Sequence, residues 1–372
     1  MLGLYLHIPF CGHICNYCNF NRGLFDAGLK TRYVAALETE IRRAGDGAAA
    51  DTIFFGGGTP SLLEPDDVGR LIAACRESFA VRPDAEVTLE TNPETVTVDR
   101  MRGFLDGGVN RVSLGVQSLH DRELARLGRQ HSSARAAEAL ADVKAAGIAD
   151  TSLDLMLWLP EQRLEDVQGT VEGLVALEPH HASLYLLELY PNAPLREEMA
   201  RSRWSLAPDD DAADMYLWAM NRLESAGYAQ YEISNVARAG HQSRHNLKYW
   251  QDGEWLGFGC GAHSTRGAAR WKNVASTEDY VNRVVAGTPV ALDWRERSHD
   301  ERLGDALFTG LRLTDGVDLA VVGARYGVDA WARYEPALRP HAAAGRLTFD
   351  GSRVRLTRDG MLVANDVMSV FV

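Results

Sequence analysis

The sequence has little of several features that would settle its class at once. Its 372 residues include only five cysteines, and it has no low-complexity tail and no internal repeat of fixed short period. No run approaches the ~20 apolar residues that a membrane helix needs. We find no signal peptide, and five is an odd number of cysteines, so a secreted disulfide framework is excluded.

Positive charge is also scarce. The net charge of −12 argues against a general binder of nucleic-acid phosphates. Hydrophobic residues make up 46% of the chain and charged residues 24%, which is enough for a large core. We therefore expect a cytoplasmic protein that binds no nucleic acid and has no membrane span, although peripheral association with a membrane stays open.

Three of the five cysteines lie close together near the start of the chain. Cys11, Cys15 and Cys18 follow an apolar run, with three and then two residues between them. Three thiolates are one short of the four that hold a [4Fe–4S] cluster, so one iron would stay free for another ligand. Structural zinc is the alternative, with His7 or His13 as a fourth ligand, but no second pair of closely spaced cysteines exists.

The cysteine spacing, preceded by Tyr5-Leu-His-Ile-Pro-Phe10, resembles the radical S-adenosylmethionine (SAM) enzymes. Within that superfamily it resembles the anaerobic coproporphyrinogen III oxidase-like family, which includes the heme chaperone branch HemW. The resemblance covers Tyr5 to about residue 265. It implies that SAM chelates the fourth iron and that one electron from the cluster cleaves SAM to a 5′-deoxyadenosyl radical.

Short apolar strands alternate with amphipathic helices through the first half of the chain. We predict strands at 2–8, 51–55, 86–90, 111–115, 151–156 and 181–187, and helices at 30–43, 65–79, 98–105, 133–146 and 164–177. Six strand–helix units predict a parallel sheet. The fold class is then α/β, an open partial (β/α)6 TIM-like barrel, which the resemblance also implies. Functional groups are expected at the carboxyl ends of its strands.

Polar or glycine residues stand at several of these predicted strand ends. The run Gly56-Gly57-Gly58-Thr59 follows the second strand, and Glu90, Gln117 and Asp154 lie at the next three. A structural hydrogen bond explains each of these alone equally well, but their shared position favours a ligand site. The resemblance implies that SAM is bound by Tyr5, Tyr17, Gly57, Gly58, Thr59, Glu90, Gln117, Arg129 and Asp154.

One residue departs from the family pattern near this set. Trp158 stands where the family has a glycine, and we expect its indole to narrow the pocket beside SAM. A narrower pocket argues against a second SAM, or a bulky substrate, at that point.

A second group of residues lies farther along the chain, at Arg244-His245-Asn246-Leu-Lys-Tyr249-Trp250. Imidazole is a good axial ligand for heme iron, and Tyr and Trp offer flat apolar surface to a macrocycle. A hydrogen-bonded core or loop histidine is the alternative. The block resembles the motif that marks HemW, which implies heme binding by His245, Asn246, Tyr249 and Trp250, with His263 and Cys260 as further candidates.

Features of coproporphyrinogen III dehydrogenases are missing. Phe20 occupies the position of their fourth cysteine, and we expect no N-terminal extension and find no compact arginine cluster for substrate carboxylates. We therefore expect a heme chaperone that delivers heme to apo-hemoproteins such as respiratory cytochromes, with little or no turnover. The alternative is an enzyme, either that dehydrogenase or a class C radical SAM methyltransferase.

The pattern changes toward the end of the chain. We predict two domains, 1–290 and 291–372. The second has helices at 300–311, 319–326, 329–339 and 359–370, with a hairpin turn at Asp350-Gly351. This order resembles a winged-helix α+β domain, and its dispersed acidic residues favour a packing or docking lid over DNA binding.

Overall fold

A computed structural model describes all 372 residues. One 12-stranded sheet dominates it, and six of its strands lie side by side and parallel in chain order. They are β1 (Leu2–Ile8), β4 (Ala49–Gly57), β5 (Ala80–Thr91), β6 (Arg111–Gln117), β7 (Asp150–Leu157) and β8 (His181–Leu186). All six predicted strands are confirmed. β1 is buried on both faces, as expected for a central parallel strand.

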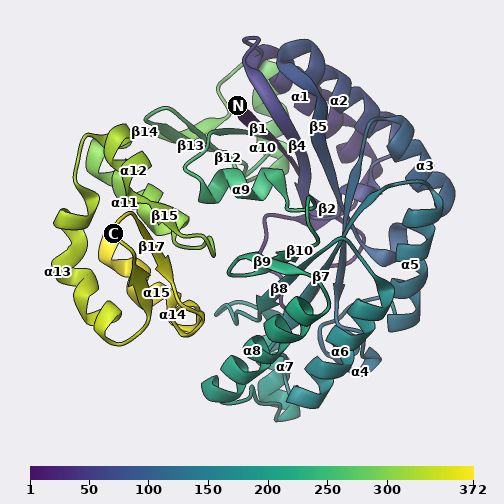
Figure 1. Ribbon diagram of the computed structural model, residues 1–372. Helices are drawn as coiled ribbons and strands as arrows, with labels where there is room; N and C mark the ends of the chain where they lie inside the picture. Colours follow the sequence, from purple (N-terminus) through teal and green to yellow (C-terminus); the bar gives the residue numbers. More distant parts are fainter.

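Helices cover the outer face of this sheet, as Figure 1 shows. They are α1 (Ala27–Ala44), α2 (Pro65–Ser78), α3 (Val98–Asp106), α4 (Asp121–Arg126), α5 (Ser133–Ala145) and α6 (Leu164–Leu177), and three of them begin at a capping side chain, such as Asp26 before α1. Short 3-10 turns occupy Pro60–Leu62, Pro93–Thr95 and Ser369–Phe371. A core of 57 buried residues lies between the strands and helices.

The sheet extends beyond the six predicted strands at both edges. Next to β1 come β11 (Trp255–Phe258), β12 (His263–Arg266), β13 (Ala269–Asn273) and β14 (Ala291–Glu296), with helix α10 (Thr277–Ala286). Next to β8 lie the antiparallel strands β10 (Asn235–Ala237) and β9 (Ala229–Glu232). The two edges do not pair with each other, so the barrel stays open.

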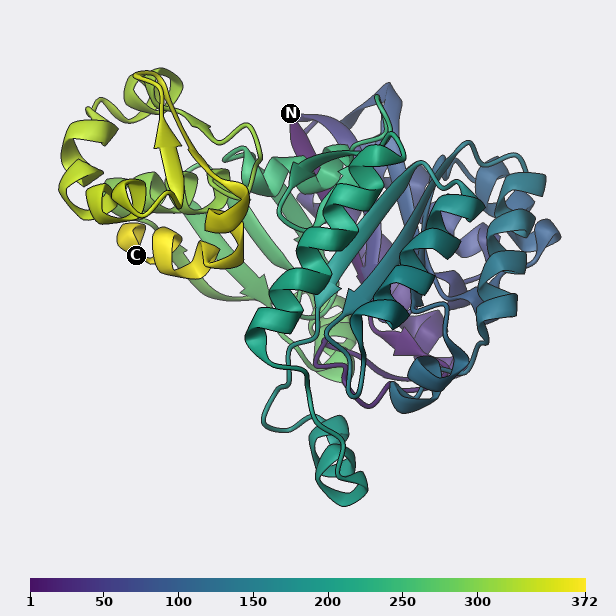
Figure 2. The same ribbon diagram turned by 60° about the horizontal axis from the view of Figure 1, so that its bottom comes forward.

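Three helices link these edge strands: α7 (Pro194–Ser202), α8 (Asp209–Ser225) and α9 (Arg244–Trp250). The short strands β2 (Phe10–Cys11) and β3 (Gly23–Leu24) bracket the cysteine loop. α7 projects from the body of the molecule in Figure 2. It approaches the cysteine loop, because Leu195 N donates to Asn16 O at 2.9 Å.

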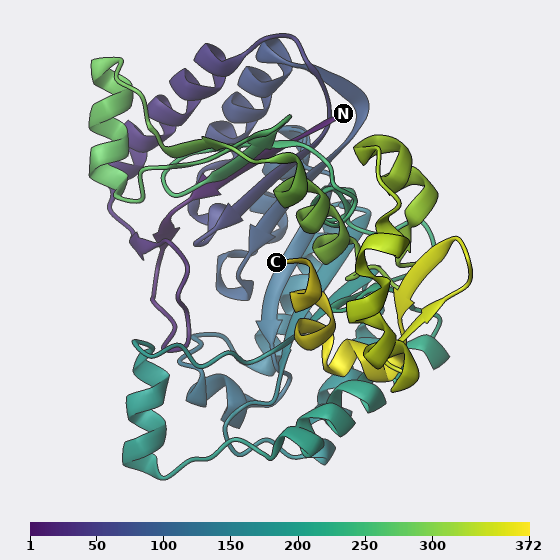
Figure 3. The same ribbon diagram turned by 90° about the vertical axis from the view of Figure 1, so that its left-hand side faces the viewer.

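The C-terminal domain has its own core of 17 buried residues, from Leu303 to Phe371. It contains α11 (His299–Gly310), α12 (Leu319–Tyr326), α13 (Ala330–Ala343), α14 (Arg358–Leu362), α15 (Ala364–Met368), and the strands β15 (Val317–Asp318), β16 (Leu347–Phe349) and β17 (Arg353–Leu356). Figure 3 shows it, in yellow-green, on the side away from the purple cysteine loop. None of the chain's helices combines the length and apolar character needed to cross a membrane.

One predicted element of this domain is wrong. A single final helix was expected over 359–370, but the chain forms α14 and α15 with a break at Val363, where φ is −119°. The bend returns Val367 and Phe371 to the domain core. The boundary after residue 290 stays a prediction; the strand that follows it, β14, pairs with β13 in the main sheet.

Candidate functional site

The cysteine loop begins two residues after β1 ends. Cys11 is buried, Cys15 and Cys18 are half-buried, and all three are free thiols. Burial raises the pKa of Cys11, and the neighbouring Cys18 and Cys15 raise it further, while a hydrogen bond with Thr59 lowers it. Cys15 and Cys18 therefore lie close enough to Cys11 to affect its thiol.

As they lie, the three sulfurs are farther apart than the ligands of a single zinc ion. Four tetrahedral ligands with Zn–S bonds of about 2.3 Å would bring the sulfurs to about 3.8 Å from one another. The three sulfurs are not among the groups whose ligand atoms all lie within 4.8 Å of one another. Wider spacing suits a cluster, whose irons keep the thiolates apart.

Arg129 links these cysteines to the strand ends. Its Nη1 donates to Cys15 Sγ at 3.5 Å, and its Nη2 donates to Asn92 Oδ1 and Gly115 O, both at 2.7 Å. Asn92 Nδ2 in turn donates to Thr59 Oγ1 at 3.0 Å. Sequence reasoning did not single out Asn92, although its position two residues after Glu90 was a signal.

Tyr17 lies in the same group. Burial raises the pKa of its phenol, the Arg129 guanidinium lowers it, and Cys15 and Cys18 raise it again. Gln117 lies at the end of β6 with a positive φ of 69°, and its amide lies near Gly115. Tyr17, Thr59 and Arg129 therefore lie beside the cysteines.

Gly57 and Gly58 allow the end of β4 to come close to the start of the cysteine loop. Gly57 has φ +118°, and a Cβ there would lie 2.6 Å from His7 Cε1. A Cβ on Gly58 would lie 2.6 Å from the Phe10 carbonyl oxygen. Neither position can hold a side chain without moving its neighbour, so the close approach depends on glycine.

Glu90 is held by the backbone of the glycine run and has a strongly shifted pKa. Gly57 N donates to Glu90 Oε2 at 3.1 Å. Burial raises the pKa of Glu90 to about 8, the nearby Asp154 contributes to the rise, and the Gly57 hydrogen bond opposes it. A carboxyl group that stays protonated at neutral pH would ionise beside a cation such as an ammonium group.

A cavity of about 220 Å³ lies inside the barrel and brings the two predicted groups together. Its strand residues alternate, as in Ser152 and Asp154, because every second side chain of a strand faces inward. Tyr5, Glu90 and Asp154 from the predicted SAM set line it together with His245, Asn246 and Tyr249 of α9. No local pattern in the sequence indicated that these two sets line the same cavity.

His245 is buried in the part of the cavity wall that α9 forms. Its Nδ1 is 2.8 Å from Thr52 Oγ1 and its Nε2 is 2.9 Å from Tyr249 Oη. Burial lowers the pKa of His245 to about 3, so the ring is neutral. Both ring nitrogens are engaged, and the predicted bond from His245 to heme iron would require one of these contacts to break.

The two further heme candidates, His263 and Cys260, do not line the cavity that His245 lines. His263 is exposed on β12. Cys260 is fully buried, with its sulfur 3.6 Å from Thr277 Oγ1 and 3.7 Å from Asn21 Nδ2.

A second cavity, of about 900 Å³, lies between the barrel and the C-terminal domain. Sixteen of its 25 lining residues are hydrophobic. Most of them come from the end of β8, from α8 and from α14 and α15, and Trp158 and Ile233 add to these. Helix α9 contributes Asn246, Tyr249 and Trp250. Asn246 and Tyr249 line both cavities, so α9 separates the polar barrel interior from the larger apolar space.

Trp158 lines this larger cavity and not the smaller one, so its indole does not narrow the smaller cavity. Its φ is +63°, which fits the glycine of the family pattern. Its Nε1 donates to Ala207 O at 2.8 Å, which holds the indole against the segment before α8.

Comparison with known proteins agrees with this geometry. Residues 5–174 match the Radical SAM superfamily model, and residues 298–363 match the HemN C-terminal domain. The chain is 33% identical to the heme chaperone HemW of Bacillus subtilis, covering 100% of this chain and 99% of that protein. It is 36% identical to the heme chaperone HemW of Mycobacterium tuberculosis H37Rv, covering 98% and 93%.

A solved structure also matches along the whole chain. Coproporphyrinogen III oxidase (HemN) from Escherichia coli, described as a radical SAM enzyme, aligns with a TM-score of 0.87 at 23% identity, over 100% of this chain and 89% of that one. At that identity the likeness concerns the fold alone, and it confirms the predicted fold class.

Proposed function

The chain belongs to the radical SAM superfamily and, within it, to the HemW family, and from this membership we propose that it is a heme chaperone. In this proposal it binds heme and passes it to apo-hemoproteins such as respiratory cytochromes. The single observation that supports this most is the large apolar cavity walled by the α9 residues Asn246, Tyr249 and Trp250.

The chemistry of this cavity suits a flat amphiphile with carboxylates. The Arg312 guanidinium lies 4.4 Å from the centre of the Trp250 ring. The Trp250 indole N–H and Arg312 Nε are buried and have no hydrogen-bond partner. Buried donors without partners are costly, so a propionate oxygen that reached them would remove this cost, while the apolar walls would cover the macrocycle.

We propose further that Cys11, Cys15 and Cys18 hold a [4Fe–4S] cluster, with SAM beside it. A reduced cluster supplies one electron to SAM when both are bound. Arg129 would hold Cys15 and position the strand ends through Asn92. Glu90 and Asp154 would take polar groups of SAM, Gly57 and Gly58 would let the backbone approach it, and Tyr5, Tyr17, Thr59 and Gln117 would complete the site.

Hemin titration of the anaerobically reconstituted chain tests the heme proposal. We expect about one equivalent per chain, and Trp250→Ala should weaken binding at least tenfold, because it removes both the flat surface and the free indole donor. Trp294→Ala is the matched control, since Trp294 is 58% exposed on β14 and does not line the cavity. Equal affinity in the wild-type chain and Trp250→Ala would contradict the assignment of the cavity.

The enzyme alternative has its own test. Coproporphyrinogen III, SAM and a reductant should give no protoporphyrinogen, because Phe20 replaces the fourth cysteine and its side chain is 65% exposed at the cysteine loop. Robust decarboxylation by the purified chain would overturn the chaperone proposal in favour of the dehydrogenase.

A further inference from the structure

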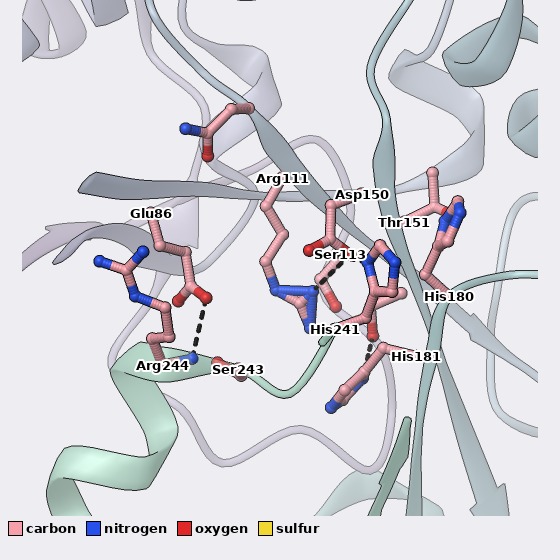
Figure 4. Close-up of polar contacts among 12 residues, drawn as sticks. Glu86, Arg111, Ser113, Asp150, Thr151, His180, His181, His241, Ser243 and Arg244 are labelled. Atoms are coloured by element: carbon pink, nitrogen blue, oxygen red, sulfur yellow. Dashed lines mark hydrogen bonds and ion pairs between the residues drawn. The ribbon is translucent and has the colours of Figure 1, made fainter. Parts of the chain in front are cut away.

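Asp150, His180 and His241 form a compact group at the other end of the barrel from the cysteine loop. Asp150 is the first residue of β7, and His180 directly precedes β8. The cysteines instead follow the last residue of β1, which runs parallel to these strands. His241 lies in the segment between β10 and α9, and Figure 4 shows it facing Asp150 and His180.

The ligand atoms of this group are close and largely free. One atom from each of the three residues lies within 4.8 Å of the others. His241 Nδ1 is 3.4 Å from Asp150 Oδ2, yet it is buried and makes no hydrogen bond. His180 Nδ1 contacts Thr151 Oγ1 at 3.1 Å, which leaves its Nε2 as the available nitrogen.

The arrangement of the two rings and the carboxylate also suits a metal ligand set. The two imidazole rings lie 4.4 Å apart between centroids, a contact that two imidazolium ions would oppose. Arg111 Nη1 is 3.4 Å from Asp150 Oδ1, so the other carboxylate oxygen faces His241.

We propose that Asp150, His180 and His241 bind a divalent transition-metal ion of the zinc type. Two neutral imidazoles and one carboxylate are a ligand set that zinc accepts, with water at the fourth position. Zinc–ligand bonds of about 2.0–2.1 Å place tetrahedral ligands about 3.3 Å apart. Side-chain rotations that bring the ligand atoms about 1.5 Å closer would therefore complete the site without moving a strand.

The ion would fix the start of α9 to the barrel. At present the segment before α9 is held to β8 by Arg238 N, which donates to His180 O at 2.8 Å. A metal bound by His180 and His241 adds a second and stronger link between the same two segments. α9 carries Tyr249 and Trp250 into the large cavity, so metal would stiffen that wall whatever the cavity binds.

Anaerobic calorimetric titration with zinc chloride tests the site. The full chain is used with its cluster reconstituted, so that the three cysteines are occupied. We expect one high-affinity zinc equivalent, weakened about 100-fold or more in His241→Ala and in Asp150→Asn, since loss of a ligand costs at least as much as loss of an outer-shell partner. His299→Ala is the control, because His299 faces a single carboxylate, Asp300 at 3.9 Å, without a second imidazole.

Asp150→Asn preserves the shape of the side chain, so it separates loss of a ligand from misfolding. In the wild-type chain zinc should also increase hydrogen-exchange protection over residues 238–250, and it should not do so in His241→Ala. The proposal is overturned if zinc does not bind, or if it binds equally well to the wild-type chain, Asp150→Asn and His241→Ala.

Discussion

Replacement of Glu90 by Gln should make the cluster-free fold less sensitive to alkaline pH. Burial, together with Asp154, raises the pKa of Glu90 to about 8 from an ordinary value of 4.5. The folded chain therefore keeps a proton that the unfolded chain loses above pH 4.5. Stability from this group is fully present below that value and is lost as the pH rises through 8.

The size of this effect follows from proton linkage. Between pH 6 and pH 7.5 the folded state holds about one more proton than the unfolded state, which costs about 1.4 kcal/mol per pH unit, or about 2 kcal/mol in all. The Glu90 carboxyl lines the cavity, so screening by solvent reduces the expected loss of stability to about 1–2 kcal/mol. The Gln side chain keeps an oxygen for the Gly57 N–H and has no such dependence.

Urea unfolding of the cluster-free wild-type and Glu90→Gln chains at pH 6.0 and 7.5 measures the difference. The wild-type chain should lose about 1–2 kcal/mol more than the variant over this interval. Glu197→Gln, on the exposed side of α7, should behave as the wild type. Equal losses in the wild type and Glu90→Gln would refute the claim that Glu90 is protonated in the fold. In the reconstituted chain Glu90→Gln should also weaken the change that SAM causes in the cluster EPR signal.

Three further outcomes are expected at the cluster end. Cys15→Ala should lower the iron content after reconstitution from about four per chain to near zero, whereas Cys75→Ala should keep the full iron content, because Cys75 is a core residue. Stoichiometric zinc without iron in the wild type would contradict the cluster. Gly57→Ala should abolish the SAM-dependent EPR change and destabilise the chain by about 1–3 kcal/mol, because its Cβ would meet the His7 ring and its φ is +118°. Gly12→Ala is the control: a Cβ there has open space around it, so the EPR change and the stability should both stay as in the wild type. Arg129→Met should lower the cluster reduction potential by on the order of tens of mV in redox titration, since it removes a cation and an N–H donor from Cys15; an unchanged potential would mean that this contact is absent in the loaded protein.

Local sequence signals predicted most of the barrel. Apolar runs predicted β1 and β4 to β8, because each strand is long enough to be buried between helices and to appear in the sequence as a continuous apolar stretch. The edge strands β9 to β13 have three to five residues each, too few for a pattern to be distinguished from a loop. The final helix was overpredicted, because periodicity continues through Val363 while the domain core requires a bend there.

The site residues that could be predicted are those whose spacing along the chain is itself the signal. Cys11, Cys15 and Cys18 are neighbours in sequence, and Glu90 and Asp154 follow the rule for parallel strand ends. The meeting of Tyr5, Glu90 and Asp154 with α9 depends on the return of the chain beside β1, which no local pattern reports. The contacts of both His245 ring nitrogens, with Thr52 and Tyr249, could not be predicted from the sequence either.

Heme transfer measures the central proposal most directly. The chain is loaded with one equivalent of hemin and mixed with increasing concentrations of an apo-cytochrome, and formation of the holo spectrum is followed with time. A chaperone that hands heme over in a complex predicts a transfer rate that increases with acceptor concentration, and a lower heme occupancy in Trp250→Ala at the start. A rate that equals spontaneous hemin dissociation and does not depend on acceptor concentration would contradict the chaperone function.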